Sequence, residues 1–309
     1  MQGRPARDGV RSVAVPLQFH RAPSRAAAVA ATAAALVSLL AVPSAAGSSS
    51  GIDFRSGFDA GSIAPWKGAQ VEYDRPMADS IRIVASPRRT GTGAAMFVTR
   101  QGYSPFGYNE SAELCCGPTP HPTEGSDYWY AWSTLFGEPW YGPYKWGIFA
   151  QWHSDYGLPP PLDFNVGVAA ISVQLHTGAV SLENGGSWEY ERTFRLLDDV
   201  SPGRWHDFVV HVHWSAYRQG SLTVWHRLAG EPRLVRLLRM RKVPTLQRLG
   251  NEVSPVYAKL GLYRASYCSQ PTQLGCTSPL GVQHDTIVFH DDFRRSTVVF
   301  PGCTVCRNG

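Results

Sequence analysis

The feature that most constrains the fold of this chain is a succession of short apolar or alternating runs, separated by Gly, Pro, Asn and Asp. They cover residues 81–84, 94–99, 128–136, 145–153, 163–175, 205–214, 222–225, 257–263, 286–289 and 297–300. No long stretch has helical periodicity, although residues 234–248 are ambiguous. Short strands between turn residues, in a chain with ten Trp and thirteen Tyr, are typical of a β-sandwich. We therefore expect an all-β protein that forms a single β-jelly-roll sandwich.

The N-terminal residues have the organisation of a targeting segment. Five arginines precede an apolar run over residues 26–42, and the small residues Ser44, Ala45 and Ala46 follow it. This order predicts a secretory signal peptide over residues 1–46. An uncleaved membrane anchor is the alternative, which the shortness of the run disfavours. We expect a flexible Gly/Ser lead-in over residues 47–51, one jelly-roll domain over residues 52–309, and a secreted monomer without a membrane span.

Charge gives little information about partners. The signal segment holds five of the 29 Lys and Arg and one of the 24 Asp and Glu, so the remaining chain is nearly neutral. One basic cluster stands out, because residues 233–248 contain six Lys and Arg and no acid. It is either a solvated edge or a basic lip that attracts a polyanion. No motif typical of nucleic-acid readers accompanies it, so we expect no nucleic-acid partner.

All six cysteines follow the signal segment, and an even number in an exported chain predicts disulfides. We expect Cys268 and Cys276 to pair across a short loop. One of the fifteen possible connectivities joins Cys115 and Cys116 each to one cysteine of the C-terminal pair, Cys303 and Cys306, and the sequence leaves the choice open. A redox or zinc function for Cys303-x-x-Cys306 is the alternative, which lacks a second Cys-x-x-Cys.

Residues 145–153 combine an apolar face with polar chemistry. Strand alternation places Ile148, Ala150 and Trp152 on one face, and Phe149, Gln151 and His153 on the other. The amide of Gln151 can donate to a carboxylate while the imidazole of His153 accepts a proton beside it. An ordinary strand end with polar residues in solvent is the alternative interpretation.

A second polar face is expected on residues 257–263. Lys259, Gly261 and Tyr263 alternate onto one side of this predicted strand. A glycine between a cationic and a phenolic side chain leaves room for a ligand to approach the backbone.

Three short motifs resemble those of the jelly-roll polysaccharide lyases, a concanavalin A-like superfamily that includes alginate lyases, heparin lyase I-like proteins and glucuronan lyase-like proteins. Gln151-Trp152-His153 resembles the Gln-x-His strand of that group. Residues 257–263, Tyr-Ala-Lys-Leu-Gly-Leu-Tyr, resemble its Tyr-x-Lys-x-Gly-x-Tyr strand. Residues 111–114, Ser-Ala-Glu-Leu, resemble its Arg-Ser-Glu-Leu strand. The three occur in matching order and spacing, and the resemblance extends over nearly all of the mature chain.

The resemblance implies β-elimination at a uronic acid of an acidic polysaccharide, bound in a concave groove. Gln151 would neutralise the uronate carboxylate, and His153 would either neutralise it or take the C5 proton. Tyr263 would protonate the departing O4 and could also serve as the base. Lys259, on the same face, would lower the pKa of Tyr263 by favouring the phenolate. No cofactor is required.

One position departs from the resembled pattern. Ser111 stands where the group has an arginine, and serine cannot supply a fixed cationic fork. Either the amides of Asn109 and Gln151 suffice, or activity is weakened or lost. The full set of expected substrate-binding residues is Asn109, Glu113, Trp146, His211, His213 and Arg264.

A structural calcium site is a further hypothesis. Asp291, with Asp292 beside it, and Asp53 near the other end of the domain are candidate ligands where the termini meet. A solvated acidic turn explains the C-terminal pair equally well.

Two other functions remain open from the sequence. An endo-glycoside hydrolase on the same type of sandwich needs two suitably spaced carboxylates, and no Glu-x-Asp-x-Glu run is present. A non-catalytic, lectin-like carbohydrate-binding protein would keep the groove without turnover, and Ser111 favours this alternative.

Overall fold

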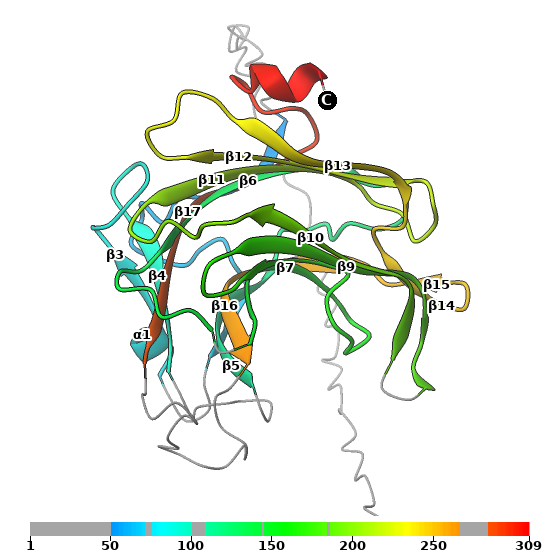
Figure 1. Cartoon of the computed structure of the whole chain (residues 1–309), viewed down its shortest axis with the longest axis horizontal. Helices are drawn as coiled ribbons and strands as arrows, with labels where there is room; N and C mark the ends of the chain where they lie inside the picture. Colours follow the sequence, from blue (N-terminus) through cyan, green and yellow to red (C-terminus); the bar gives the residue numbers. More distant parts are fainter. Residues whose placement is uncertain are drawn as a thin grey trace, which may run out of the picture. The chain divides into compact units, whose positions relative to one another are not determined.

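The protein folds into two large β-sheets stacked face to face (Figure 1). The computed structural model describes residues 51–71, 76–100, 109–143, 145–183, 186–265 and 284–308. In spatial order, the first sheet consists of β13 (Val235–Val243), β12 (Gly220–Leu228), β11 (Trp205–His213), β6 (Asp127–Phe136), β17 (Thr286–Ser296), β4 (Ala94–Thr99) and β3 (Ile81–Val84), with β1 (Ile52–Ser56) paired to β17. The described residues thus confirm the predicted all-β jelly-roll sandwich.

The second sheet carries the concave face of the sandwich (Figure 1). Its strands, in spatial order, are β15 (Glu252–Val253), β14 (Gln247–Leu249), β9 (Ile171–Ser181), β8 (Leu162–Val166), β7 (Gly147–Ser154), β16 (Val256–Ala265), β5 (Asn109–Gly117) and β2 (Gly68–Val71), with β10 (Ser187–Leu197) paired to β9. The helices described are one turn of α-helix, α1 (Met77–Ser80), and a 3-10 helix (Thr304–Asn308). No helix in this described part is long and apolar enough to cross a membrane.

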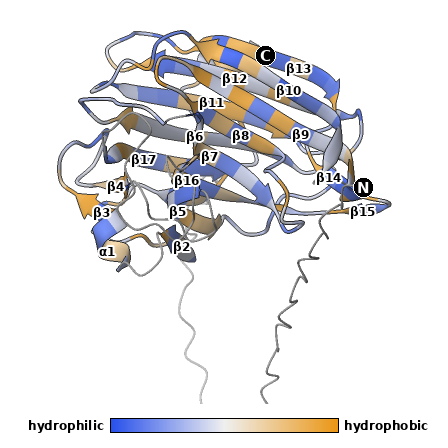
Figure 2. Ribbon diagram, turned by 60° about the horizontal axis from the view of Figure 1, so that its bottom comes forward, coloured by the Kyte–Doolittle hydropathy of each residue, from blue (hydrophilic) through white to orange (hydrophobic). Residues whose placement is uncertain are grey.

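The core lies between the sheets, because each strand turns alternate side chains inward. Hydrophilic and hydrophobic residues accordingly alternate along several strands in Figure 2. Trp132 of β6 stacks on Phe208 of β11, with ring centroids 5.3 Å apart. Trp152 of β7, from the opposite sheet, meets Trp132 edge-on at 5.9 Å. All three side chains are buried, so aromatic rings from both sheets interlock.

The alternation predicted for residues 145–153 is wrong at one point in β7. The ladder with β8 shifts by one residue between Ile148 and Ala150, as in a β-bulge. The bulge sends Phe149 into the core and leaves Ile148 on the concave face. Beyond it the alternation holds, since Ala150 and Trp152 are core residues while Gln151 and His153 face outward.

The described residues all belong to one compact unit, Gly47–Gly309. Residues 234–248, ambiguous in sequence, form β13 and the start of β14. The signal peptide over residues 1–46 and all of the 47–51 lead-in except Gly51 lie outside the described residues, and both stay predictions.

Candidate active site

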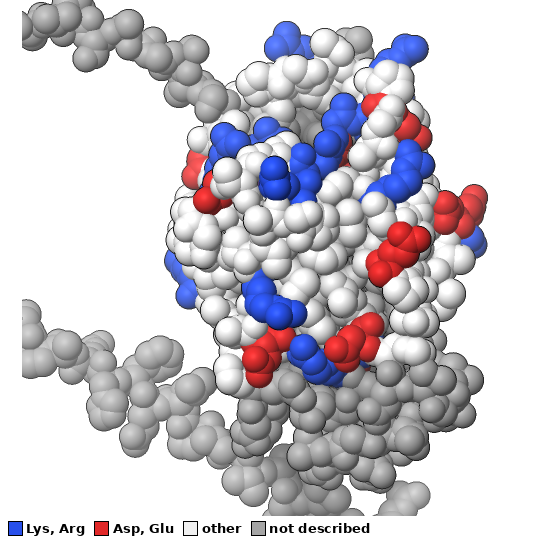
Figure 3. Space-filling view, turned by 90° about the vertical axis from the view of Figure 1, so that its left-hand side faces the viewer, with Lys and Arg blue, Asp and Glu red and all other residues white. Residues whose placement is uncertain are grey.

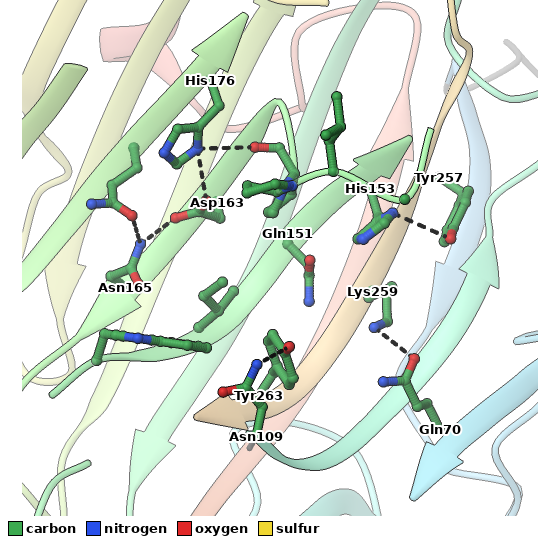
Figure 4. A pocket seen from close by; sticks show the side chains of 17 residues that line it. Gln70, Asn109, Gln151, His153, Asp163, Asn165, His176, Tyr257, Lys259 and Tyr263 are labelled. Carbon is green, nitrogen blue, oxygen red and sulfur yellow. Dashed lines mark hydrogen bonds and ion pairs between the residues drawn. The ribbon is translucent and has the colours of Figure 1, made fainter. Parts of the chain in front are cut away.

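A groove with a volume of about 720 Å³ lies on the concave face of the second sheet (Figure 4). The loop of residues 157–160 closes one side of it. Side chains from six neighbouring strands line its floor and walls, including Gln70, Asn109, Gln151, His153, Asp163, Asn165, Gln174, His176, Tyr257, Lys259 and Tyr263. The structure therefore brings the sequence-predicted residues Gln151, His153, Lys259, Tyr263, Asn109 and Trp146 to one cavity.

A buried ion pair supports the floor of the groove. Lys259 Nζ lies 2.5 Å from Glu113 Oε2, and Gln151 Nε2 donates to Glu113 Oε1 at 2.5 Å. The ammonium group also donates to Gln70 Oε1 at 3.0 Å. Since Glu113 is 1% exposed and does not line the groove, its carboxylate supports Gln151 and Lys259 from below. The prediction that Glu113 binds substrate is therefore wrong.

The contacts do not favour the expectation that Lys259 lowers the pKa of Tyr263. The ammonium is engaged by Glu113, and it lies 5.8 Å from the centre of the Tyr263 ring. Burial raises the pKa of Tyr263, although a hydrogen bond from Asn109 opposes the effect. That bond runs from Asn109 Nδ2 to the phenolic oxygen at 2.6 Å, so the hydroxyl hydrogen stays available to a ligand. Tyr263 is thus a protonated acid at neutral pH.

His153 has the opposite character. Its Nδ1 lies 2.6 Å from the carbonyl oxygen of Ser154, which can only accept, so Nδ1 carries the hydrogen. The hydroxyl of Tyr257 lies 3.4 Å from the same nitrogen. Burial, reinforced by the charge of Lys259, lowers the pKa of His153. The ring is therefore neutral at neutral pH, with the lone pair on Nε2.

The far half of the groove was missed by the sequence reasoning. Asp163 and Asn165 of β8 lie beside Gln174 and His176 of β9 on the same wall. Asn165 Nδ2 donates to Asp163 Oδ1 and lies 3.0 Å from Gln174 Oε1. The sequence signal was Asp-x-Asn alternating within an otherwise apolar strand.

Ser111 lies under the groove floor. It is buried, and its Oγ donates to Glu113 Oε2 at 3.2 Å. Its directly opposed partner in β16 is Tyr263. Position 111 therefore contributes to the buried network that supports the floor, and it does not line the groove.

Two histidines expected in the groove lie elsewhere. His211 and His213 are on β11 of the first sheet, where both rings pair with Asp127, at 2.7 and 3.1 Å. His211 also stacks on Trp129, with centroids 4.2 Å apart. The prediction that they bind substrate in the groove is wrong because they belong to the other sheet.

Arg264 is also absent from the groove. It is fully buried and forms an ion pair with Glu110, with Nε 2.6 Å from Oε2. Because Arg264 follows Tyr263 directly in a strand, its side chain points to the opposite face. The prediction that it binds substrate is wrong.

The predicted calcium ligands have other partners. Asp53 pairs with the buried guanidinium of Arg295 at 2.8 Å. Asp291 accepts hydrogen bonds from the backbone N–H groups of Arg89, Thr90 and Asp292. In the described ranges, no group of three or more His, Cys, Asp or Glu side chains is placed to hold a metal ion. The geometry therefore does not support the calcium hypothesis.

The basic cluster of residues 233–248 is a solvated edge. Most of it lies on β13, at the edge of the first sheet, where Arg236, Arg239 and Arg241 are exposed. None of its charged residues lines the groove. On the face shown in Figure 3, basic and acidic side chains occur side by side. The alternative of a basic lip at the groove is not supported.

The connectivity considered for four cysteines is wrong. Cys115 is bonded to its neighbour Cys116, and Cys303 to Cys306. The first pair ends β5 in the second sheet, whereas Cys303 and Cys306 pack with Trp225 and Phe300 against the first sheet. The predicted Cys268–Cys276 bond lies outside the described residues.

Comparison with known proteins agrees with this architecture. The model of the polysaccharide lyase family matches residues 58–294. The structure is similar to an endo-β-1,4-glucuronan lyase from the fungus Trichoderma reesei, with 17% identity and a TM-score of 0.61 over 80% of this chain and 96% of that chain. The marine PL-14 alginate lyase from Aplysia kurodai matches with 12% identity and a TM-score of 0.42, over 76% of this chain and 92% of that chain.

A catalytic domain of a GH131 β-glucanase from Podospora anserina has 10% identity and a TM-score of 0.49, over 77% of this chain and 87% of that chain. No curated protein matches the sequence. At 17% identity, the likeness to the glucuronan lyase shows the fold alone.

Proposed function

Because the chain belongs to the polysaccharide lyase family, we propose that its groove binds a uronate-containing polysaccharide and cleaves it by β-elimination. The observation that carries this proposal is the pairing of a neutral imidazole and a protonated phenol, His153 and Tyr263, in one cavity beside Gln151. A base, an acid and an amide donor are the groups that this elimination needs.

The protonation states suggest how the work is divided. His153 Nε2 removes the proton from C5, and the electrons of that bond form the C4–C5 double bond. The C4–O4 bond then breaks as Tyr263 delivers its hydroxyl proton to O4. The protonated imidazole and the phenolate return to their starting states by exchange with solvent, so no water is added to the sugar. Gln151 donates to the uronate carboxylate, where negative charge accumulates in the transition state.

Hydrolysis by a carboxylate pair is less well supported. Among the described residues that line the groove, Asp163 is the one carboxyl group. A glycoside hydrolase of the usual kind needs a second carboxylate across the scissile bond. Glu113 is held under the floor by Lys259.

The test is to incubate the protein with glucuronan, alginate and heparin and to follow the ultraviolet absorbance of an unsaturated uronate. We expect absorbance to rise with one of the three, and Tyr263→Phe and His153→Ala to reduce the rate by about 10²–10⁴. Tyr217→Phe and His213→Ala are matched controls outside the groove and should keep wild-type rates.

Other outcomes would contradict the proposal. New reducing ends without absorbance would indicate a hydrolase, and binding without either product would indicate a lectin. Wild-type rates in both groove variants would remove His153 and Tyr263 from the mechanism.

We further propose that residues 1–46 are removed on export and that the mature, secreted chain acts without a cofactor. N-terminal sequencing of protein recovered from the culture medium should place the first residue near Gly47. A chelator should leave the rate unchanged.

A further inference from the structure

Asp163 occupies a central position in the groove that the proposed mechanism does not use. In the sheet it lies directly opposite Gln151 of β7 on one side and Gln174 of β9 on the other. Side chains of directly opposed residues share a face, so the Asp163 carboxyl group stands beside the Gln151 amide. It is 1% exposed and lines the groove.

One oxygen of this carboxyl group has no protein partner. Oδ1 accepts a hydrogen bond from Asn165, whereas Oδ2 has none in the part of the chain that is described. The nearest cationic candidate is His176, whose Nδ1 lies 3.8 Å from Oδ2. That nitrogen lies 3.3 Å from the carbonyl oxygen of Pro160, to which it donates, and burial lowers the pKa of His176. The imidazole is therefore neutral.

An ionised carboxylate in this place would be poorly compensated. It would have a single amide donor and no paired cation, which is costly for a buried charge. Burial accordingly raises the pKa of Asp163 well above its ordinary value. Because Oδ1 accepts from Asn165, the hydrogen resides on Oδ2, the oxygen without a protein partner. The groove thus contains a neutral carboxylic acid with an unused donor.

The groove is otherwise short of groups that neutralise a bound carboxylate. Lys259 is the one Lys or Arg among the described lining residues, and its ammonium contacts Glu113 and Gln70. Gln151 Nε2 already donates one hydrogen bond to Glu113. A uronate bound beside Gln151 therefore meets few free donors from the floor.

We propose that Asp163, as a neutral acid, donates its Oδ2 hydrogen to the carboxylate of the uronate bound beside Gln151. This inference rests on the proposed function, which supplies the uronate. The hydrogen bond is of the charge-assisted O–H···O⁻ type, which is short and stronger than a neutral one. It strengthens as the C5–H bond breaks and charge moves onto the carboxylate, and it weakens again when product forms. The proton is shared and returned, so Asp163 is unchanged at the end of the cycle.

The experiment compares Asp163→Asn with Asp163→Ala. Asparagine can accept from Asn165 through Oδ1 and present an N–H to the groove, whereas alanine removes both functions. We expect kcat/KM on the active polyuronate to fall by about 10²–10³ in Asp163→Ala, the usual effect of losing one transition-state donor. Asp163→Asn should stay within about tenfold of wild type. Asp199→Asn, on the surface outside the groove, is the matched control.

Two outcomes would overturn the inference. Equal losses in both variants would mean that Asp163 acts as an ionised carboxylate. If both variants keep the wild-type kcat/KM but have a lower Tm, Asp163 has only a structural role in connecting β8 to β9.

The pH dependence gives a readout that a structural role would not change. The titratable groups that face Asp163 are His176 on β9 and His153 on β7, with Glu191 of β10 beyond His176. Ionisation of Asp163 should reduce kcat/KM as pH rises. Asp163→Asn, which cannot ionise, should keep its rate to higher pH. An alkaline limb at the same pH in both proteins would contradict the inference.

A binding measurement separates this inference from the proposed function. In a His153→Ala background, the Kd of a glucuronan or alginate tetrasaccharide is measured with Asp, Asn or Ala at position 163. The carboxyl-reduced tetrasaccharide is the comparison ligand. We expect alanine to weaken binding of the uronate by about tenfold or more and of the reduced sugar little. Suppose that alanine weakens binding of the uronate alone, while the wild type forms no unsaturated product. The proposed lyase function is then wrong, and recognition of the carboxylate by Asp163 is supported. Equal weakening of both sugars, or of neither, overturns the inference whether or not the protein is a lyase.

Discussion

At the scale of single residues, burial and local partners determine which groove side chains are acids and which are bases. His153 is a partly buried imidazole whose Nδ1–H is bound by a carbonyl, so Nε2 accepts. Asp163 is a buried acid and Tyr263 a partly buried one, and the pKa values of both are raised. These opposite shifts are the arrangement that acid–base catalysis at one pH requires.

The acid limb of the pH–rate profile should reflect His153. Burial lowers its pKa, so the neutral form that accepts the C5 proton persists below the ordinary value of about 6.5. We therefore expect kcat/KM to fall only at a pH below that value. The midpoint of the fall is measured at substrate concentrations well below KM, where kcat/KM reports the pKa of the free enzyme. A midpoint at or above 6.5 would contradict the assignment of His153 as the base.

The ion pair under the floor makes a second residue-scale prediction. Lys259→Met leaves the Glu113 carboxylate buried without its cation, which should lower the free energy of unfolding by about 3–5 kcal/mol. Urea unfolding measures this change. Replacing both partners, as Glu113→Gln with Lys259→Met, should recover most of the loss, because the glutamine carbonyl still accepts from Gln151. If Lys259→Met were as stable as wild type, the Lys259–Glu113 pair would not be buried.

At the scale of elements, the site is a set of neighbouring strands, and the sequence predicted some of them better than others. Alternation in residues 257–263 correctly placed Lys259 and Tyr263 on one face, although the pairing of β16 shifts register against both β5 and β7 within this stretch. The same rule excludes Arg264 from that face. The bulge in β7 was not predictable, because an extra residue becomes visible only against the partner strand. The positions of His211 and Asp163 required knowledge of the sheet to which each strand belongs, which depends on long-range pairing.

Gly261 was expected to leave room for a ligand, but the backbone of the neighbouring strand β5 occupies the space beside it. A Cβ on Gly261 would lie 2.6 Å from the Cα of Glu113 and would overlap the carbonyl of Ala112. The glycine has φ of +152°. Close contact between β16 and β5 is therefore what requires a glycine here.

Gly261→Ala should separate β16 from β5. We expect a loss of about 2–4 kcal/mol in the free energy of unfolding, from overpacking and backbone strain together, with a lower kcat because Lys259 and Tyr263 shift. Gly250→Ala is the matched control, since Gly250 also has positive φ but nothing within 4 Å of its added Cβ. It should lose only about 1 kcal/mol. Equal losses in the two variants, measured by chemical denaturation, would contradict the steric explanation.

At the scale of the whole molecule, a buried histidine joins the two sheets. His290 of β17 accepts from the hydroxyl of Thr134 at Nδ1 and donates from Nε2 to the carbonyl of Gly261, each at 3.0 Å. The second bond crosses from the first sheet to the second, directly behind the groove floor. Burial lowers the pKa of His290 to about 3.

This histidine should make the fold sensitive to acid. Because its folded pKa lies below the unfolded value, its contribution is complete above pH 6.5 and is lost as pH falls toward 3. The loss is about 1.4 kcal/mol per pH unit. Relative to His290→Gln, wild type should therefore lose roughly 3 kcal/mol between pH 7 and 4.5. Urea unfolding of both proteins at the two pH values measures the difference. A pH-independent difference would contradict a neutral, buried His290.

The strand order of the second sheet also bears on how the protein acquires activity during folding. β16 lies between β7 and β5, yet it follows them by about a hundred residues or more of chain. Pairing at such sequence separation is slow, because the loop entropy is lost before the contacts form. Tyr263 reaches Asn109 and the cavity of His153 only when β16 inserts, so partly folded chains should lack the groove. Recovery of enzymatic rate during refolding would then report completion of this sheet, later than the first gain of β-structure seen by circular dichroism.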